Sequence, residues 1–284
     1  AMKLEADRMR NLILTKEEFA KEIKVVMEER RLRTDDQPHA LVYEKMMSVA
    51  YQSHPYRRPI IGWMNDLENM SVDDAQEWYD RWYAPNNAVL VVVGDVDPKE
   101  VYSLAQKYYG EIKSRPIASL ALRKPQTEVT QTGIKRLQVK APAQMPYLVM
   151  GYHAPVLHDA NADWEPYALE MLVGVLDGND SARLNKELVR EKQIASSINA
   201  DYDSTGRGPG MFFLSGTPSE GRSAAELESA LRIEIERLIN AGVTEKELGR
   251  VRAQVVSGHV FQLDSMFYQA MQICLLYTSD AADE

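Results

Sequence analysis

The chain has 284 residues, with 33 lysines and arginines against 42 aspartates and glutamates, and a formal net charge of −9. This length has room for one large domain or two ordinary ones, each able to bury a core. A mildly acidic chain without a basic cluster is a poor nucleic-acid binder, and its longest apolar run, residues 88–93, is far too short to span a membrane.

Residues 15–33 predict an amphipathic helix. Thr15, followed by Glu18 three positions later, is a capping-box pattern in which side chains satisfy the free N–H groups of the first turn. On a wheel of ~100° per residue, the apolar side chains gather on one face. They are Phe19, Ile23, Val26 and Met27.

Glu22 and Glu29 are the unusual residues of this helix. They lie seven positions apart, so they share one azimuth at the border of the apolar face. Carboxylates beside apolar neighbours are costly to desolvate unless a cation or a hydrogen-bond donor compensates them. In one interpretation both side chains reach water or pair with a base of the same helix, namely Lys21, Arg30 or Arg33.

In a second interpretation the two glutamates belong to a metal site. Seven residues at a rise of ~1.5 Å place the two Cα atoms ~10 Å apart along the helix axis. One carboxylate could therefore bind an ion directly while the other supports it. The spacing does not decide which of them has which role.

The remaining helices of the first half follow from their periodicity and caps. A helix over residues 39–50 is followed by one over 72–82, which Ser71 and Asp74 cap, and by one over 99–109. We interpret Asp97 as the cap of the last helix and not as a calcium ligand, because further oxygen ligands at regular spacing are absent.

Two other stretches of the first half carry separate predictions. Residues 88–93 form a continuous, valine-rich apolar run, which is typical of a strand buried in a sheet. His54 lies in a proline-containing loop with no neighbouring ligand pattern, so we expect it at the surface.

The second half follows a polar, proline-bearing stretch, residues 110–133, that predicts an inter-domain linker. The strands predicted beyond it are residues 134–140, 147–152, 194–204 and 211–217. The predicted helices are residues 164–176, residues 182–191 with Asp180 or Ser181 as cap, one from the Ser223 cap to residue 241, and one from the Thr244 cap to about residue 262. This order points to an α+β fold with antiparallel sheets.

The glycines between the last two strands do not predict a phosphate site. The segment TGRGPG leads into a strand and not into a helix N-terminus, so the amide donors that a phosphate needs are not gathered there. We interpret it as a hairpin turn.

The final stretch, residues 274–284, departs from the preceding amphipathic pattern. Its sequence, CLLYTSDAADE, resembles one reading frame of a transposase adapter, so we expect a non-native tail and exclude it from the fold. It holds three of the 42 acids, which leaves 39 against 33 basic residues and a net charge of −6. It also holds Cys274, the only cysteine, so the rest of the chain carries no disulfide information.

The motif that begins at Glu22, E-x-x-V-V-x-E-E-R-R-x-R-x-D-D-x-P, resembles the segment of the pitrilysin/insulinase family of zinc peptidases that supplies the third zinc ligand. Three more matches follow in the same order, and the resemblance extends to about Ile273. They are HPYRRPIIG from residue 54, WYAPNNAVLVVVGDV from residue 82 and GNDSARLNKELVREKQIA from residue 178. The resemblance implies that Glu29 is the zinc-ligating glutamate and Glu22 the supporting one.

The resemblance also implies two homologous α+β domains with antiparallel sheets packed against helices. Residues 1–115 would be the C-terminal half of the first, zinc-binding domain, and residues 116–132 the linker. Residues 133–273 would be the second domain, truncated at its C-terminus, before the tail of residues 274–284.

The family's H-x-x-E-H motif brings two histidine ligands and the general-base glutamate. None of the five histidines here lies in such a motif. We therefore expect a fragment, inactive by itself, of a zinc metalloendopeptidase that hydrolyses peptides or unfolded polypeptides. In the implied mechanism Glu29 and two upstream histidines hold the zinc, an upstream glutamate takes the proton of its water, and Glu22 orients the ligands by hydrogen bonding.

Two other interpretations stay open at this point. The protein could be a catalytically inactive family member that serves as a processing partner or structural subunit. It could also be an α+β binding module unrelated to metals, which predicts solvated side chains for Glu22 and Glu29. As to partners, the resemblance implies a homodimer or a heterodimer with a family member, and as to location it favours the bacterial periplasm or cell envelope.

Overall fold

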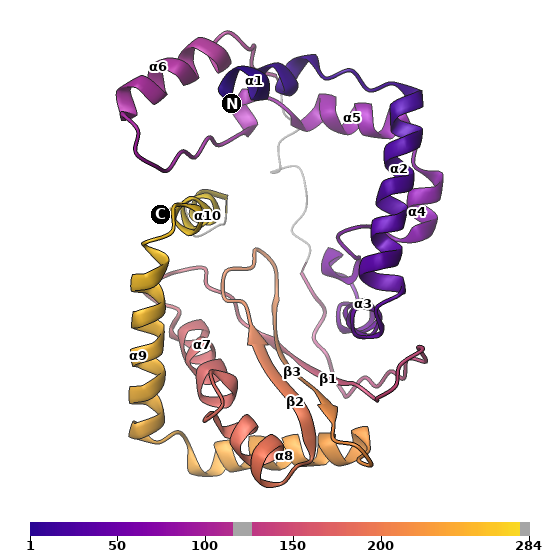
Figure 1. Cartoon of the computed structure of the whole chain (residues 1–284), viewed down its shortest axis with the longest axis vertical. Coiled ribbons are helices and arrows are strands. Elements are labelled where there is room, and N and C mark those ends of the chain that lie inside the picture. The colour runs from indigo at the N-terminus through magenta and orange to yellow at the C-terminus, as the bar shows by residue number, and fades with distance from the viewer. Residues whose placement is uncertain (116–126, 279–284) are drawn as a thin grey trace.

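The computed structural model describes residues 1–115 and 127–278. The first half is helical and curves over a second half that is built on a sheet (Figure 1). Its helices are α1 (Met2–Asn11), α2 (Lys16–Arg30), α3 (Pro38–Ala50), α4 (Met64–Asn69), α5 (Val72–Trp82) and α6 (Pro98–Tyr109). Between them lie the short turns η1 (Arg31–Asp35), η2 (Pro55–Arg57) and η3 (Pro85–Asn87).

The second half contains the strands and the longer helices. In chain order the elements are β1 (Leu148–Ala154), α7 (Trp164–Asp177), η5 (Asn185–Glu191), β2 (Ala195–Tyr202), β3 (Gly210–Pro218), α8 (Ala224–Ala241), α9 (Glu245–Gln262) and α10 (Met266–Thr278). Helix α10 returns toward the first half (Figure 1).

Several helices begin where the sequence supplies a side-chain cap. Thr15 accepts a hydrogen bond from the backbone N–H of Glu18, and Asp97 accepts from the N–H groups of the first turn of α6. Reciprocal capping boxes start three more helices, formed by Ser71 with Asp74, Ser223 with Glu226 and Thr244 with Glu247. The predicted starts of these helices are confirmed, because a cap depends only on residues at most three positions apart.

The strands form one antiparallel, three-stranded sheet in the order β1-β3-β2. The predicted hairpin between β2 and β3 is confirmed. One face of the sheet packs against α7, η5 and α8 to form the main core, in which Leu188, Leu214 and Leu227 are fully buried. The α+β class with an antiparallel sheet is therefore confirmed, with the sheet lying in the second half of the chain.

Helix α3 of the first half covers the opposite face of this sheet. Ala50 and Tyr51 at its end are buried against Met211 of β3. At Gly151 of β1 a Cβ atom would lie 2.3 Å from Cε of Met46 and 2.6 Å from Cε of Met211, so the methionine side chains of α3 and β3 occupy the space beside this glycine. The sheet thus lies between α3 on one side and α7 and α8 on the other.

Two predicted strands are wrong. Residues 88–93 form no strand within the described parts of the chain, and Val89, Leu90 and Val92 are exposed. Residues 134–140 are also unpaired, and their polar side chains bridge helices instead: Lys135 Nζ donates to the Val49 carbonyl and Arg136 pairs with Glu228. An apolar run becomes a strand only where another strand supplies its hydrogen bonds, which the run itself does not encode.

Smaller differences concern helices. Helix α4 was not predicted, and η5 is a π-helix whose preceding turn is held by Asn179, which accepts from the Ser181 N–H, and not by a cap from Asp180 or Ser181. Helix α10 continues past Cys274 to Thr278, so the backbone does not break where the sequence pattern does. The predicted linker falls partly, and the end of the predicted tail wholly, outside the described residues, and the predicted domain boundaries stay predictions.

No helix in the described parts of the chain is long and apolar enough to cross a membrane.

Candidate metal centre

Glu29 lies in the last turn of α2 with a partly exposed side chain. Its Oε1 lies 2.9 Å from Nη1 of Arg33, and the two side chains are 39% and 76% exposed. An ion pair this open to solvent contributes about 0–1 kcal/mol. The Glu29 carboxylate is therefore available to a stronger cation, which Arg33 would not exclude.

Glu22 lies two turns earlier on α2 and is exposed. In residues 1–115 and 127–278 its side chain has no hydrogen bond or ion pair. Lys21, one of the partners considered for it, pairs instead with Glu18 at 2.9 Å and Glu17 at 3.3 Å, and these bonds raise the pKa of Lys21. The structure does not join Glu22 to Glu29.

Arg30, which sequence reasoning considered as a partner of these glutamates, points into the protein instead. It is 4% exposed, and its guanidinium forms a bidentate ion pair with the Glu44 carboxylate of α3, with N–O distances of 2.8 and 3.2 Å. Nη1 also donates to the Gly62 carbonyl at 2.8 Å, and Nη2 lies 3.3 Å from Oδ1 of Asp35. Hydrogen bonding to Glu44 raises the pKa of Arg30.

The sequence carried a signal for this buried arginine. Arg30 follows Ile23 and Val26 at helical spacing, so it continues the apolar face of α2. Glu44, its partner, lies fourteen residues further on in another helix, and no local pattern connects the two. Trp63 lies beside this ion pair: the centre of its ring is 5.8 Å from the Arg30 guanidinium carbon and 5.1 Å from Nζ of Lys45.

His54 is buried, which corrects the surface position expected for it. Its ring packs edge-on against Tyr56 at 4.5 Å and near Tyr51 at 5.8 Å, and Gly208 of the β2–β3 turn lies against it. Burial lowers the pKa of His54 against an opposing effect of Glu128. The two tyrosines lie close to His54 in the sequence, but Gly208 and Glu128 lie far from it, so the composition of the loop did not reveal its burial.

The fit of the described residues to a zinc ion is partial. Proteins usually bind catalytic zinc through three side chains. Across residues 1–115 and 127–278, no three histidine, cysteine, aspartate or glutamate side chains come together as a metal site. Glu29 can supply one carboxylate ligand, and no reaction step through a metal follows from the described residues alone.

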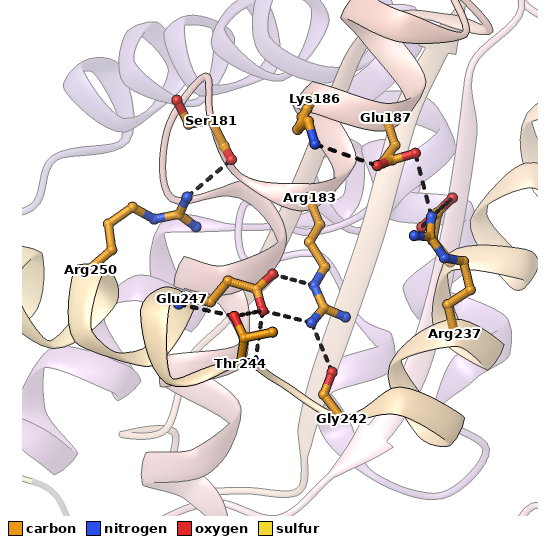
Figure 2. Close-up of polar contacts among 10 residues, drawn as sticks. Ser181, Arg183, Lys186, Glu187, Arg237, Gly242, Thr244, Glu247 and Arg250 are labelled. Carbon is orange, nitrogen blue, oxygen red and sulfur yellow. Dashed lines mark hydrogen bonds and ion pairs between the residues drawn. The ribbon is translucent and has the colours of Figure 1, made fainter.

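The motif of residues 178–195 has a structural role in the second half. Arg183 Nε and Nη2 lie 2.5 and 2.8 Å from the Glu247 carboxylate, and Nη2 also donates to the Gly242 carbonyl (Figure 2). The Arg183 hydrogen bond, together with the bonds from Thr244, lowers the pKa of Glu247 to about 2 against the effect of burial. Arg183 thus fastens this motif to the first turn of α9.

Comparison with known proteins decides the family. The protein-family model described as the peptidase M16 inactive domain matches residues 69–255 of this sequence. The chain belongs to the peptidase M16 family. The predicted resemblance to the pitrilysin/insulinase peptidases is therefore confirmed.

Individual M16 relatives agree over nearly the whole chain. A zinc protease of Helicobacter pylori, PqqE, is 28% identical over 269 residues, which are 93% of this chain and 59% of that protein. The crystal structure of a protease from Helicobacter pylori superimposes with a TM-score of 0.89 at 27% identity, covering 97% of this chain and 65% of that one. The chain thus spans about three fifths of the length of these relatives.

The M16 fold also occurs outside proteins named as proteases. A chain in the structure of Complex III2 from Candida albicans superimposes with a TM-score of 0.72 at 19% identity, covering 98% of this chain and 66% of that chain. At this identity the likeness concerns the fold alone.

Proposed function

We propose that the complete protein is a zinc metalloendopeptidase that hydrolyses peptides or unfolded polypeptides, and that Glu29 is one of its zinc ligands. The observation that carries the proposal is the environment of Glu29. Its side chain is partly exposed and, among the described residues, pairs only with the solvent-exposed Arg33. It lies at the end of α2, which the buried Arg30–Glu44 ion pair holds in place. The M16 relatives named as zinc proteases support the metal.

In this proposal the residues of this chain have limited roles. Glu29 supplies a carboxylate oxygen, and Glu22 supports the site from two turns away through another group, since the two carboxylates do not touch. Bound zinc would supply Lewis-acid chemistry. The remaining ligands and the general base come from a part of the complete protein outside this chain, so the chain by itself is inactive.

The test uses the complete protein with two matched variants. Glu29→Gln removes the proposed ligand, and Glu28→Gln alters the adjacent glutamate, which forms a similar exposed pair with Arg31 at 3.1 Å. Zinc content per protein and hydrolysis of an unstructured peptide are measured. We expect Glu29→Gln to lose most zinc and nearly all activity while Glu28→Gln keeps both. Wild-type zinc content in Glu29→Gln would refute the ligand assignment.

The alternative function is that of a catalytically inactive M16 member acting as a processing partner or structural subunit. The observation that favours it is the match to the inactive domain of the family, together with the same fold in a Complex III2 chain. It predicts a complete protein that binds no zinc and cleaves no peptide but co-purifies with a second M16 chain.

The idea of a binding module unrelated to metals loses its premise with the M16 assignment, although Glu22 is exposed as that idea predicted. We further propose a homodimer or a heterodimer with another M16 chain, and a place in the bacterial periplasm or cell envelope. Light scattering of the complete protein and fractionation of the source cells test these two points.

A further inference from the structure

The last turn of α2 is fastened to its surroundings by one buried arginine. Arg30 and Glu44 are 4% and 7% exposed, and they are joined by two hydrogen bonds. We propose that Glu44, acting through Arg30, is a positioning residue that sets the orientation of the Glu29 carboxylate for metal binding. This inference rests on the proposed role of Glu29.

The Arg30 side chain ties α2 to three other parts of the fold. It reaches Glu44 in α3, the Gly62 carbonyl in the turn before α4, and Asp35 in η1. A planar guanidinium that meets a carboxylate with two parallel bonds fixes direction as well as distance. The helix therefore cannot rotate or slide at this turn without breaking several buried contacts.

Glu29 inherits this restraint because it is the residue directly before Arg30. Neighbouring residues of a helix differ by ~100° in direction and ~1.5 Å in height. Fixing Arg30 toward the interior therefore fixes the Cα–Cβ direction of Glu29 at the edge of the buried face. The exposed pair with Arg33 cannot do this, since both of its side chains are free to move in solvent.

The other turns of α2 have no comparable anchor. Glu22 is exposed, and the apolar residues Ile23, Val26 and Met27 are only partly buried. Directly after Arg30 the backbone widens into the π-helical turn η1, in which the Asp36 N–H donates to the Arg31 carbonyl. Turns of this kind recur at functional sites. The restraint is thus concentrated at the turn that carries Glu29.

The experiment measures metal binding to the complete protein after its metal has been removed. Glu44→Gln keeps the size of the side chain and removes the charge. A double variant, Arg30→Met with Glu44→Leu, replaces the pair by apolar side chains and leaves no buried charge unpaired. Glu28→Gln is the control on the same turn. Zinc affinity is measured by competition with a chelator, and the absorption spectrum of the cobalt-loaded protein reports the ligand geometry.

We expect both Glu44→Gln and the double variant to bind zinc roughly 10- to 100-fold more weakly than wild type. Their cobalt spectra should differ from the wild-type spectrum, while Glu28→Gln matches it. Circular dichroism at the assay temperature confirms that each variant is folded. If Glu44→Gln does not fold, the double variant decides.

Two results separate this inference from the proposed function. If Glu29→Gln loses zinc but Glu44→Gln or the double variant, as the folded protein, keeps wild-type affinity and the wild-type cobalt spectrum, the positioning role is wrong and the ligand role stands. If Glu29→Gln itself binds zinc as wild type does, the ligand role is wrong and the positioning role falls with it.

Discussion

The Glu128 carboxylate accepts a hydrogen bond from the backbone N–H of His54 at 2.8 Å. The same carboxylate accepts from the N–H groups of Gln52 and Ser53, at 2.6 and 3.0 Å. One side chain just before the second half therefore orders the loop after α3. That loop in turn reaches the β2–β3 turn, where Tyr51 donates to the Pro209 carbonyl and Gly208 N–H donates to Tyr56.

Glu128→Gln should destabilise the protein by about 1 kcal/mol, because a neutral amide replaces a carboxylate that receives several charge-assisted bonds at a partly solvated site. The midpoint of urea unfolding checks this. The control is Glu220→Gln, an exposed residue of the turn before α8, which should leave the midpoint unchanged. Equal midpoints for the two variants would show that the Glu128 contacts contribute nothing to stability.

Burial of His54 should make stability depend on pH near neutrality. Its pKa in the folded protein lies below the ordinary value of 6.5, so the unfolded chain binds the proton more readily. This contribution is fully present above pH 6.5 and is lost as the pH falls through the folded pKa. Urea midpoints at pH 7.5 and 5.5 should therefore differ more in wild type than in His54→Asn.

Glu128 does not interfere with this comparison. Its pKa is lowered to about 2, since the hydrogen bonds from residues 52–54 outweigh desolvation, so its contribution is present above the ordinary value of 4.5 and is lost as the pH falls toward 2. A pH response of His54→Asn equal to that of wild type would mean that other groups cause the effect.

Glu247→Gln should weaken the attachment of α9 to the motif of residues 178–195. The variant removes the charge that pairs with Arg183 and weakens the cap of α9, at side chains that are each 19% exposed. We expect a loss of about 2 kcal/mol and faster hydrogen exchange in the first turns of α9. Glu245→Gln, a change at an exposed position two residues earlier, is the matched control. Equal hydrogen-exchange rates in the first turns of α9 for the two variants would contradict the prediction.

Two glycine-to-alanine changes should have opposite signs. Gly216→Ala, in β3, places a methyl group 2.7 Å from the backbone carbonyl oxygen of Ser197, which cannot move aside easily, and should cost about 1–3 kcal/mol. Gly249→Ala lies in α9 with nothing within 4 Å of the added Cβ and should stabilise by about 0.5–1 kcal/mol. Thermal melts of both variants decide; a stabilised Gly216→Ala would show that β2 and β3 do not approach each other this closely.

In the complete protein, Glu22→Gln should bind zinc about 10- to 100-fold more weakly, the usual cost of losing a group that supports a ligand. Glu17→Gln, at an exposed position five residues earlier, is the control for the same helix. Zinc affinity by chelator competition is the measurement. Unchanged affinity in Glu22→Gln would restrict the metal role to Glu29.

The sequence predicted what depends on near neighbours. The caps at Ser71, Asp97, Ser223 and Thr244 were identified because each cap and its partner lie within one helical turn. The metal role of Glu29 came from the motif around it and stays a prediction.

What the sequence did not predict involves partners far along the chain. Arg30 finds Glu44 in another helix, and His54 finds Gly208 more than 150 residues away. Residues 88–93 were wrongly predicted as a strand for a related reason. Their composition suits a strand, but a strand also needs a neighbouring strand, and none of the described strands lies beside them.

The packing of α3 on the sheet affects how this protein can be dissected. A polypeptide starting at residue 133 would retain all three strands and lose the lid over Met211 and Phe213. The apolar face of the sheet would then be exposed to solvent, which would favour aggregation. A polypeptide meant to contain the sheet should therefore begin upstream of Pro38, so that it includes α3, the helix that covers this face.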